Sequence, residues 1–144
     1  MAHDPLRVLL RVRQLTLDAA RRHLADRMRS EAAAVARSAE VAMTIAQETS
    51  AQTARPELAG VPNAYAAWLA RIKDVQCAAN EAVRSSALAT ADARVSVNDE
   101  RVAARALEAV SALAEETRRR NLAQEEQRML DEAALHGGTR RWSG

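Results

Sequence analysis

The side chains that could carry chemistry are few and scattered through the 144 residues. The three histidines, His3, His23 and His136, share no metal-ligand spacing, and the sequence has one cysteine, Cys77. It contains no Gly-rich phosphate loop, no nucleophile elbow and no pair of cysteines. We therefore expect no metal site and no cofactor. We expect Cys77 to be a small residue at or near a helix-packing surface.

Two acidic pairs, Glu115-Glu116 and Glu125-Glu126, are the remaining candidates for acid–base catalysis. Each residue of the first pair is followed four positions later by an arginine, Arg119 or Arg120. This i,i+4 spacing is typical of ion pairs on an exposed helix face. Catalysis also needs a concave pocket, which a thin helical protein does not offer. The sequence therefore predicts a protein that is not an enzyme.

The composition favours long helices. Alanine accounts for 34 residues, phenylalanine is absent, and only four glycines and three prolines interrupt the chain. The 21 basic and 19 acidic residues leave a net charge of +2, which does not identify a partner. A lone cysteine fits a reducing compartment, and neither a signal peptide nor a membrane-spanning run is visible. We expect a soluble, cytoplasmic protein.

The first helix is predicted over residues 5–54. Asp4 is placed as its N-cap and Pro5 as its first residue, a combination that favours helix initiation. From Leu6 onward, apolar or small residues recur with a mean spacing of about 3.64 residues, which is helical. The predicted stripe comprises positions 6, 10, 17, 20, 24, 28, 32, 35, 39, 42 and 46, with Arg13 as its one interruption.

A cluster of helix breakers, Pro56, Gly60 and Pro62, predicts a turn within residues 55–63. Asn63 is then placed as the cap of a second helix over residues 64–136, which Gly137 and the following glycine end. Residues 137–144 are predicted to be a frayed tail. The stripe of the second helix is predicted at positions 68, 72, 75, 79, 83, 93, 97, 104, 107, 110 and 114, and more weakly at 122 and 129.

Two long helices joined by a short loop bury their stripes most simply as an antiparallel coiled-coil hairpin. We therefore predict an all-α protein with a single domain, in which the second helix is the longer one. Folding the chain about residue 59 gives facing residues whose numbers add up to roughly 118. The predicted pairs are Ile45 with Ile72, Val35 with Val83, Leu24 with Ala93, and Leu10 with Leu107 or Val110.

This register has two consequences. The packing seam is thin, because alanine contributes little apolar area, and we expect marginal stability. Residues from about 115 to 136 have no counterpart on the first helix, which suggests that a partner binds them.

The charged and aromatic surfaces allow more than one interpretation. Residues 4–29 hold seven arginines and three aspartates. They could be the solvated flank of a coiled coil, a protein-binding surface, or a nucleic-acid or membrane contact. The arginines surround the seam and no aromatic residues interleave with them, so we expect no nucleic acid and no membrane insertion. Tyr65 and Trp68 either close the hairpin end by packing over Ile45 or form an exposed contact site.

Two segments resemble the FliJ family of flagellar type III export proteins. The stretch "PLRVLLRVRQLTLDAARRHLADRMRSEAA" resembles the opening of that family, with its leucine-rich "LLRLR"-like segment followed by an acidic residue and alanines. The stretch "LAEETRRRNLAQEEQRMLDEAA" is similar to the charged C-terminal stretch of the family. Chain length, the predicted hairpin and the aromatic residues just past the turn also agree.

The resemblance implies a non-enzymatic stalk that serves flagellum assembly and motility. In this family a coiled coil enters the hexameric export ATPase, reaches toward the export gate membrane protein, and binds export chaperones. The protein would be cytoplasmic and peripherally associated with the inner-membrane export apparatus. Two alternatives stay open: a stalk protein of a virulence injectisome, and a generic coiled-coil adaptor or dimeriser.

The stalk analogy places the ATPase contact at the end that carries both termini. The residues expected to form this contact are Leu6, Arg7, Leu10, Arg11, Arg13, Leu122 and Met129. Tyr65 and Trp68 are expected to contact the export gate or a chaperone at the turn end.

Overall fold

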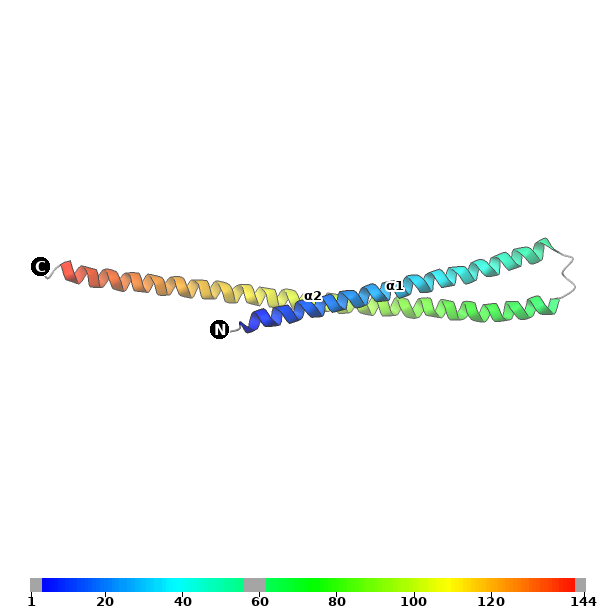
Figure 1. The fold of residues 1–144 in the computed structure, drawn as a ribbon, viewed down its shortest axis with the longest axis horizontal. Coiled ribbons are helices and arrows are strands. Elements are labelled where there is room, and N and C mark those ends of the chain that lie inside the picture. The colour runs from blue at the N-terminus through cyan, green and yellow to red at the C-terminus, as the bar shows by residue number, and fades with distance from the viewer. Residues whose placement is uncertain (1–3, 56–61, 142–144) are drawn as a thin grey trace. The chain divides into compact units, whose positions relative to one another are not determined.

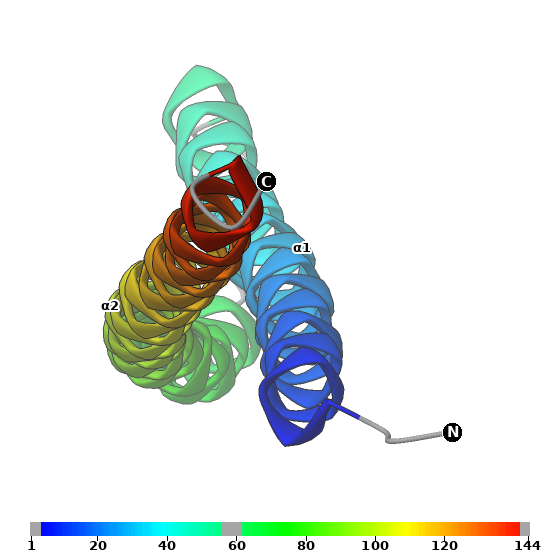
Figure 2. The same ribbon diagram turned by 90° about the vertical axis from the view of Figure 1, so that its left-hand side faces the viewer.

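A computed structural model of the chain describes residues 4–55 and 62–141. These residues form two helices, α1 (Pro5–Ala54) and α2 (Pro62–Arg141), and no strand (Figures 1 and 2). The predicted all-α hairpin with a longer second helix is confirmed.

Helix α1 begins at the predicted residue. The backbone N–H of Leu6 donates a hydrogen bond to Oδ1 of Asp4 over 3.1 Å, which is the contact expected of an N-cap aspartate. The carbonyl oxygen of Asp4 accepts from the N–H groups of Arg7 and Val8 at 3.1 and 3.3 Å. The helix ends at Ala54, and the centre of the predicted turn, residues 56–61, lies outside the described residues.

Helix α2 is longer than predicted at both ends. It begins at Pro62, two residues early, because proline has a helix-compatible φ and lacks the N–H that a first turn leaves unpaired. Asn63 therefore lies inside the helix. The helix continues through Gly137 and Gly138 to Arg141, so the predicted end at residue 136 is wrong. Neither glycine has a positive φ that would form a C-cap, and a helical glycine costs only about 1 kcal/mol.

The chain divides into two compact units, each built from a segment of both helices. Unit 1 takes Met1–Leu15 and Arg101–Gly144, and unit 2 takes Thr16–Glu100. The sequence-based expectation of a single domain stays a prediction.

Most shielded positions of unit 2 follow a seven-residue repeat. The buried and half-buried residues of α1 that obey it are Leu17, Leu24, Glu31, Ser38, Ile45 and Gln52. Those of α2 form two interleaved series, Tyr65, Ile72, Ala79, Ser86, Ala93 and Glu100, and Leu69, Gln76, Val83, Thr90 and Val97. A strict seven-residue repeat is the geometry of left-handed coiled coils.

The predicted α1 stripe departs from this seam after Leu24. Met28 and Val35 are 48% and 51% exposed, and the stripe positions 32, 39, 42 and 46 are exposed as well. Val75 and Val110 of α2 are also exposed. A stripe advancing about 3.64 residues per step rotates away from a seam that advances 3.5. The shielded residues are therefore the neighbours at positions 31, 34, 38, 41 and 45.

Three polar contacts between the helices of unit 2 fix the register. The hydroxyl of Thr90 lies 3.3 Å from the carbonyl oxygen of Arg27, and Ser38 Oγ donates to Asn80 Oδ1 over 2.8 Å. The hydroxyls of Thr49 and Tyr65 are 3.2 Å apart. The first two pairs have residue numbers that add up to 117 and 118, which agrees with the predicted register. The predicted pairing of Val35 with Val83 is wrong. Val35 is exposed, and its neighbour Ala34 is the shielded residue of α1 at this level.

The apolar core is small in both units. Its buried members are Leu17, Val41, Ala79, Ala93 and Val97 in unit 2 and Ala104 in unit 1. Half of these residues are alanines, and an alanine side chain contributes little apolar area. The small core therefore agrees with the predicted thin seam. The most completely buried side chain is the polar Thr90, at 1% exposure.

Candidate partner-binding site

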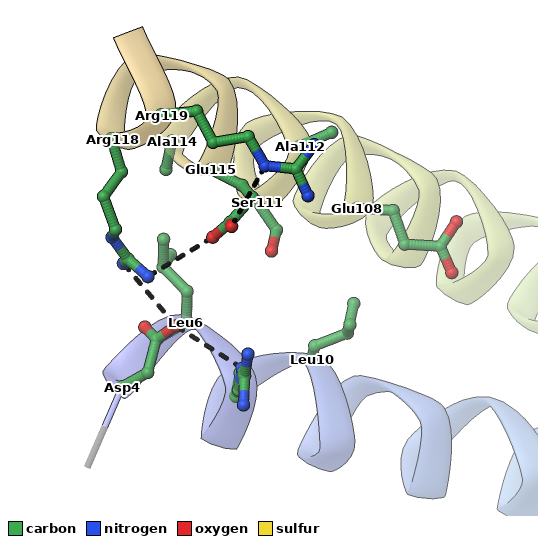
Figure 3. A pocket seen from close by; sticks show the side chains of 11 residues that line it. Asp4, Leu6, Leu10, Glu108, Ser111, Ala112, Ala114, Glu115, Arg118 and Arg119 are labelled. Carbon is green, nitrogen blue, oxygen red and sulfur yellow. Dashed lines mark hydrogen bonds and ion pairs between the residues drawn. The ribbon is translucent and has the colours of Figure 1, made fainter. Parts of the chain in front are cut away.

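The start of α1 lies beside α2 in unit 1 and forms a groove with it. Leu6 and Leu10 point from α1 toward α2 (Figure 3). The groove has a volume of about 440 Å³. It is lined by Asp4, Leu6, Arg7, Leu10, Glu108, Ser111, Ala112, Ala114, Glu115, Arg118 and Arg119.

An ion pair between Arg118 and Asp4 connects the two walls of this groove. Arg118 lies between two carboxylates, 3.9 Å from Asp4, the residue that precedes α1, and 3.3 Å from Glu115 of its own helix. Asp4 also lies 3.8 Å from Arg7, and Glu115 lies 3.5 Å from Arg119 (Figure 3). These side chains are 28% to 81% exposed, so each pair contributes at most about 1 kcal/mol. The network therefore positions the helix start more than it stabilises it.

The predicted contact residues of α1 fall into two groups. Leu6 and Leu10 are half-buried and face α2, so they offer a partner only part of their surface. Arg7, Arg11 and Arg13 are exposed.

The sequence analysis missed four exposed apolar residues on the same segment, which we call the outer α1 stripe: Val8, Leu9, Val12 and Leu15. Their exposed fractions are 53%, 52%, 51% and 58%. Positions 8, 12 and 15 have the i, i+4, i+7 spacing of one helix face, and this signal is visible in the sequence.

The part of α2 that extends past the start of α1 is uncovered (Figure 1). Every residue from 116 to 138 is exposed, as the register predicted. Leu122 and Met129 are 54% and 69% exposed, and Leu130 and Leu135 are exposed to a similar extent. A shallow groove of about 240 Å³ in this segment is lined by Glu125, Arg128, Met129 and Glu132. Exposed apolar residues bordered by charge are typical of a protein-binding surface.

In unit 2, Tyr65 and Trp68 pack against each other. Their ring centroids are 5.9 Å apart with an interplanar angle of 24°, and both side chains are half-buried. The Tyr65 hydroxyl reaches Thr49 of α1. The pair therefore contributes to packing in unit 2, and its role in a gate or chaperone contact stays a prediction.

Cys77 is exposed, so its predicted place at or near the seam is wrong. The shielded position beside it belongs to Gln76. Because Gln76 is polar, the spacing of small and apolar residues does not reveal that this position is shielded.

The described residues contain neither a cluster of metal ligands nor a helix that could span a membrane. Within them, no three His, Cys, Asp or Glu side chains gather as metal ligands would. Over the same residues, neither α1 nor α2 has an apolar stretch long enough to cross a bilayer. The chain matches no family model, no curated protein and no solved structure.

Proposed function

We propose that this chain is a non-enzymatic stalk of the flagellar type III export apparatus, in the manner of the FliJ family that its sequence resembles. The observation that supports this proposal is the exposed end of unit 1. There α2 continues past the start of α1 and presents Leu122 and Met129 between charged residues, and α1 contributes the exposed Arg7 and Arg11 to the same unit.

The proposed partner of this end is the hexameric export ATPase. A two-helix coiled coil is roughly 20 Å wide, so a ring of six subunits can hold it on only a few faces at a time. Acidic groups lining the ring would attract Arg7, Arg11 and Arg13, and this attraction weakens as salt screens the charges. The turn end, with Tyr65 and Trp68, is then available for the export gate or for export chaperones. The protein would work in the cytoplasm at the inner-membrane export apparatus.

Co-sedimentation of the full chain with the purified flagellar export ATPase hexamer tests this proposal. We expect the chain to sediment with the hexamer at low salt and progressively less as salt rises. The hexameric ATPase of an injectisome serves as the matched comparison. Failure to sediment with the flagellar hexamer, or tighter binding to the injectisome hexamer, would contradict the assignment to flagellar export.

A further inference from the structure

Unit 1 carries two exposed apolar stripes with opposite charge at their edges. The first is the outer α1 stripe, Val8, Leu9, Val12 and Leu15. Arg11 lies three residues after Val8 and four before Leu15, and Arg13 lies four residues after Leu9, so an arginine borders the stripe on each side. Both arginines are exposed.

The second stripe lies on the uncovered part of α2, and we call it the distal α2 stripe: Leu122, Met129, Leu130 and Ala133. All four residues are exposed. Glu125 lies three residues after Leu122 and Glu132 three residues after Met129, so both lie at one edge of the stripe. Glu126 lies within the stripe, four residues from both Leu122 and Leu130. Residues 121–138 hold four acidic residues and one arginine, so this segment has a net charge of −3.

The outer α1 stripe is as long as the first part of the distal α2 stripe, and the charges beside the two stripes are opposite. Val8 to Leu15 and Leu122 to Met129 each span seven residues, which is about 10 Å of helix. Two such helices can pair along a coiled-coil seam, with the glutamates of one beside the arginines of the other.

We propose that two copies of this chain associate through these stripes, with the distal α2 stripe of each copy on the outer α1 stripe of the other. The same contact then occurs twice around a two-fold axis, which closes the assembly as a dimer. Both apolar stripes are covered, and both sets of charged edges are paired.

A second copy of the chain would cover both stripes, whereas the other candidate partners would bind only one of them. An anionic lipid surface would attract the arginine-bordered stripe and repel the glutamate-bordered one. An acidic groove on another protein would likewise attract the arginine-bordered stripe and repel the glutamate-bordered one. The dimer does not depend on the export function. It would, however, cover the residues proposed to meet the ATPase, so the hexamer and the second copy would compete for them.

Sedimentation equilibrium of the full chain over a concentration series tests the dimer. We expect the mass to rise with concentration to twice the chain mass of 15.7 kDa, with weaker association at high salt. Arg11→Glu with Arg13→Glu, and separately Glu125→Arg with Glu132→Arg, should each raise the dissociation constant about tenfold or more. Combining all four substitutions should restore association. The matched controls are Arg71→Glu and Glu48→Arg, at exposed positions of unit 2, which should associate like wild type.

Several results would overturn the proposal. A chain that stays monomeric at every concentration would do so, as would a dimer that neither pair of reversals weakens. A third contradicting result concerns the variant that combines all four substitutions. If its helicity by circular dichroism equals that of wild type but its association is still weakened, the proposed pairing of the stripes is wrong. Binding of a monomer to vesicles of anionic phospholipid, lost in Arg11→Glu with Arg13→Glu, would assign the outer α1 stripe to a lipid surface. No export ATPase enters these measurements, so their failure leaves the stalk proposal separately testable.

Discussion

Asp4 shows how one side chain can both start a helix and place it. Its Oδ1 atom accepts the Leu6 N–H at 3.1 Å, while its Oδ2 atom lies 3.9 Å from Arg118 of α2. The first contact satisfies a backbone donor that a helix start leaves unpaired. The second brings the beginning of α1 to one place along α2. Capping and ion pairing can be separated, because asparagine caps a helix about as well as aspartate but carries no charge.

We expect Asp4→Ala to lower the free energy of unfolding of unit 1 by about 1 kcal/mol, and Asp4→Asn to lower it by only a few tenths. The protection of the Leu6 to Val8 amides against hydrogen exchange is the measurement. Equal loss of protection in both variants would show that the charge of Asp4, and not its cap, holds the helix start.

Cys77 supplies a second test at this scale, since its exposure contradicts the sequence-based expectation. An exposed thiol should react with a water-soluble disulfide reagent in the native protein at a rate close to that of the unfolded chain. Absorbance of the released thiolate gives both rates. Reaction at least tenfold slower in the native state would mean that the thiol is shielded, as the sequence analysis predicted.

At the scale of the helices, most of the seam of unit 2 repeats every seven residues, and Ala34 and Val41 are shielded beside the main α1 series. Val41 is 4% exposed and belongs to the seam, whereas Val35 is 51% exposed and does not. The two valines lie on the same helix, so any gain from the higher helix propensity of alanine is the same for both. Their substitutions therefore differ only in the apolar area that is lost.

We expect Val41→Ala to be less stable than Val35→Ala by about 1.5 kcal/mol, because it removes two buried methyl groups. Urea unfolding followed by circular dichroism measures this difference. Val35→Ala is the matched control and should stay within about 0.5 kcal/mol of wild type. If Val35→Ala were the more destabilising variant, the stripe with the longer period would be the true seam.

The helices and their register could be predicted because breakers and caps are local signals. Pro56, Gly60 and Pro62 predicted a hairpin, and Asp4 with Pro5 predicted the first residue of α1. The face of α1 beyond Leu24 could not be predicted in the same way. Alanines lie on several faces of that segment, so apolar spacing does not distinguish 3.5 from 3.64 residues per step.

Polar residues in the seam account for further errors. The shielded positions include Glu31, Ser38, Gln76 and Thr90, which a search for apolar residues passes over. In the candidate site, the exposure of Leu122 and Met129 could be predicted from the register alone. The spacing of the outer α1 stripe is visible in the sequence, but spacing alone does not show which of the two apolar faces of residues 6–17 packs against α2.

At the scale of the whole molecule, the two units differ in what they expose. Unit 1 presents the outer α1 stripe and the distal α2 stripe, whereas unit 2 packs Tyr65 and Trp68 against each other. This asymmetry supports the proposal that the terminal end meets the export ATPase. Contact with the gate or with chaperones is proposed for the turn end.

The most direct test of this account is a binding isotherm of the full chain with the purified export ATPase hexamer, at concentrations where the chain is monomeric. We predict that Leu122→Ala with Met129→Ala, and separately Arg7→Glu with Arg11→Glu, weakens binding about tenfold or more with unchanged helicity. The matched control, Met43→Ala with Leu88→Ala, removes exposed apolar side chains of unit 2 and should bind like wild type. Trp68→Ala should weaken binding to the hexamer less than the terminal variants do. Wild-type affinity in both terminal variants, together with loss of binding in Trp68→Ala, would show that the opposite end of the hairpin enters the ring.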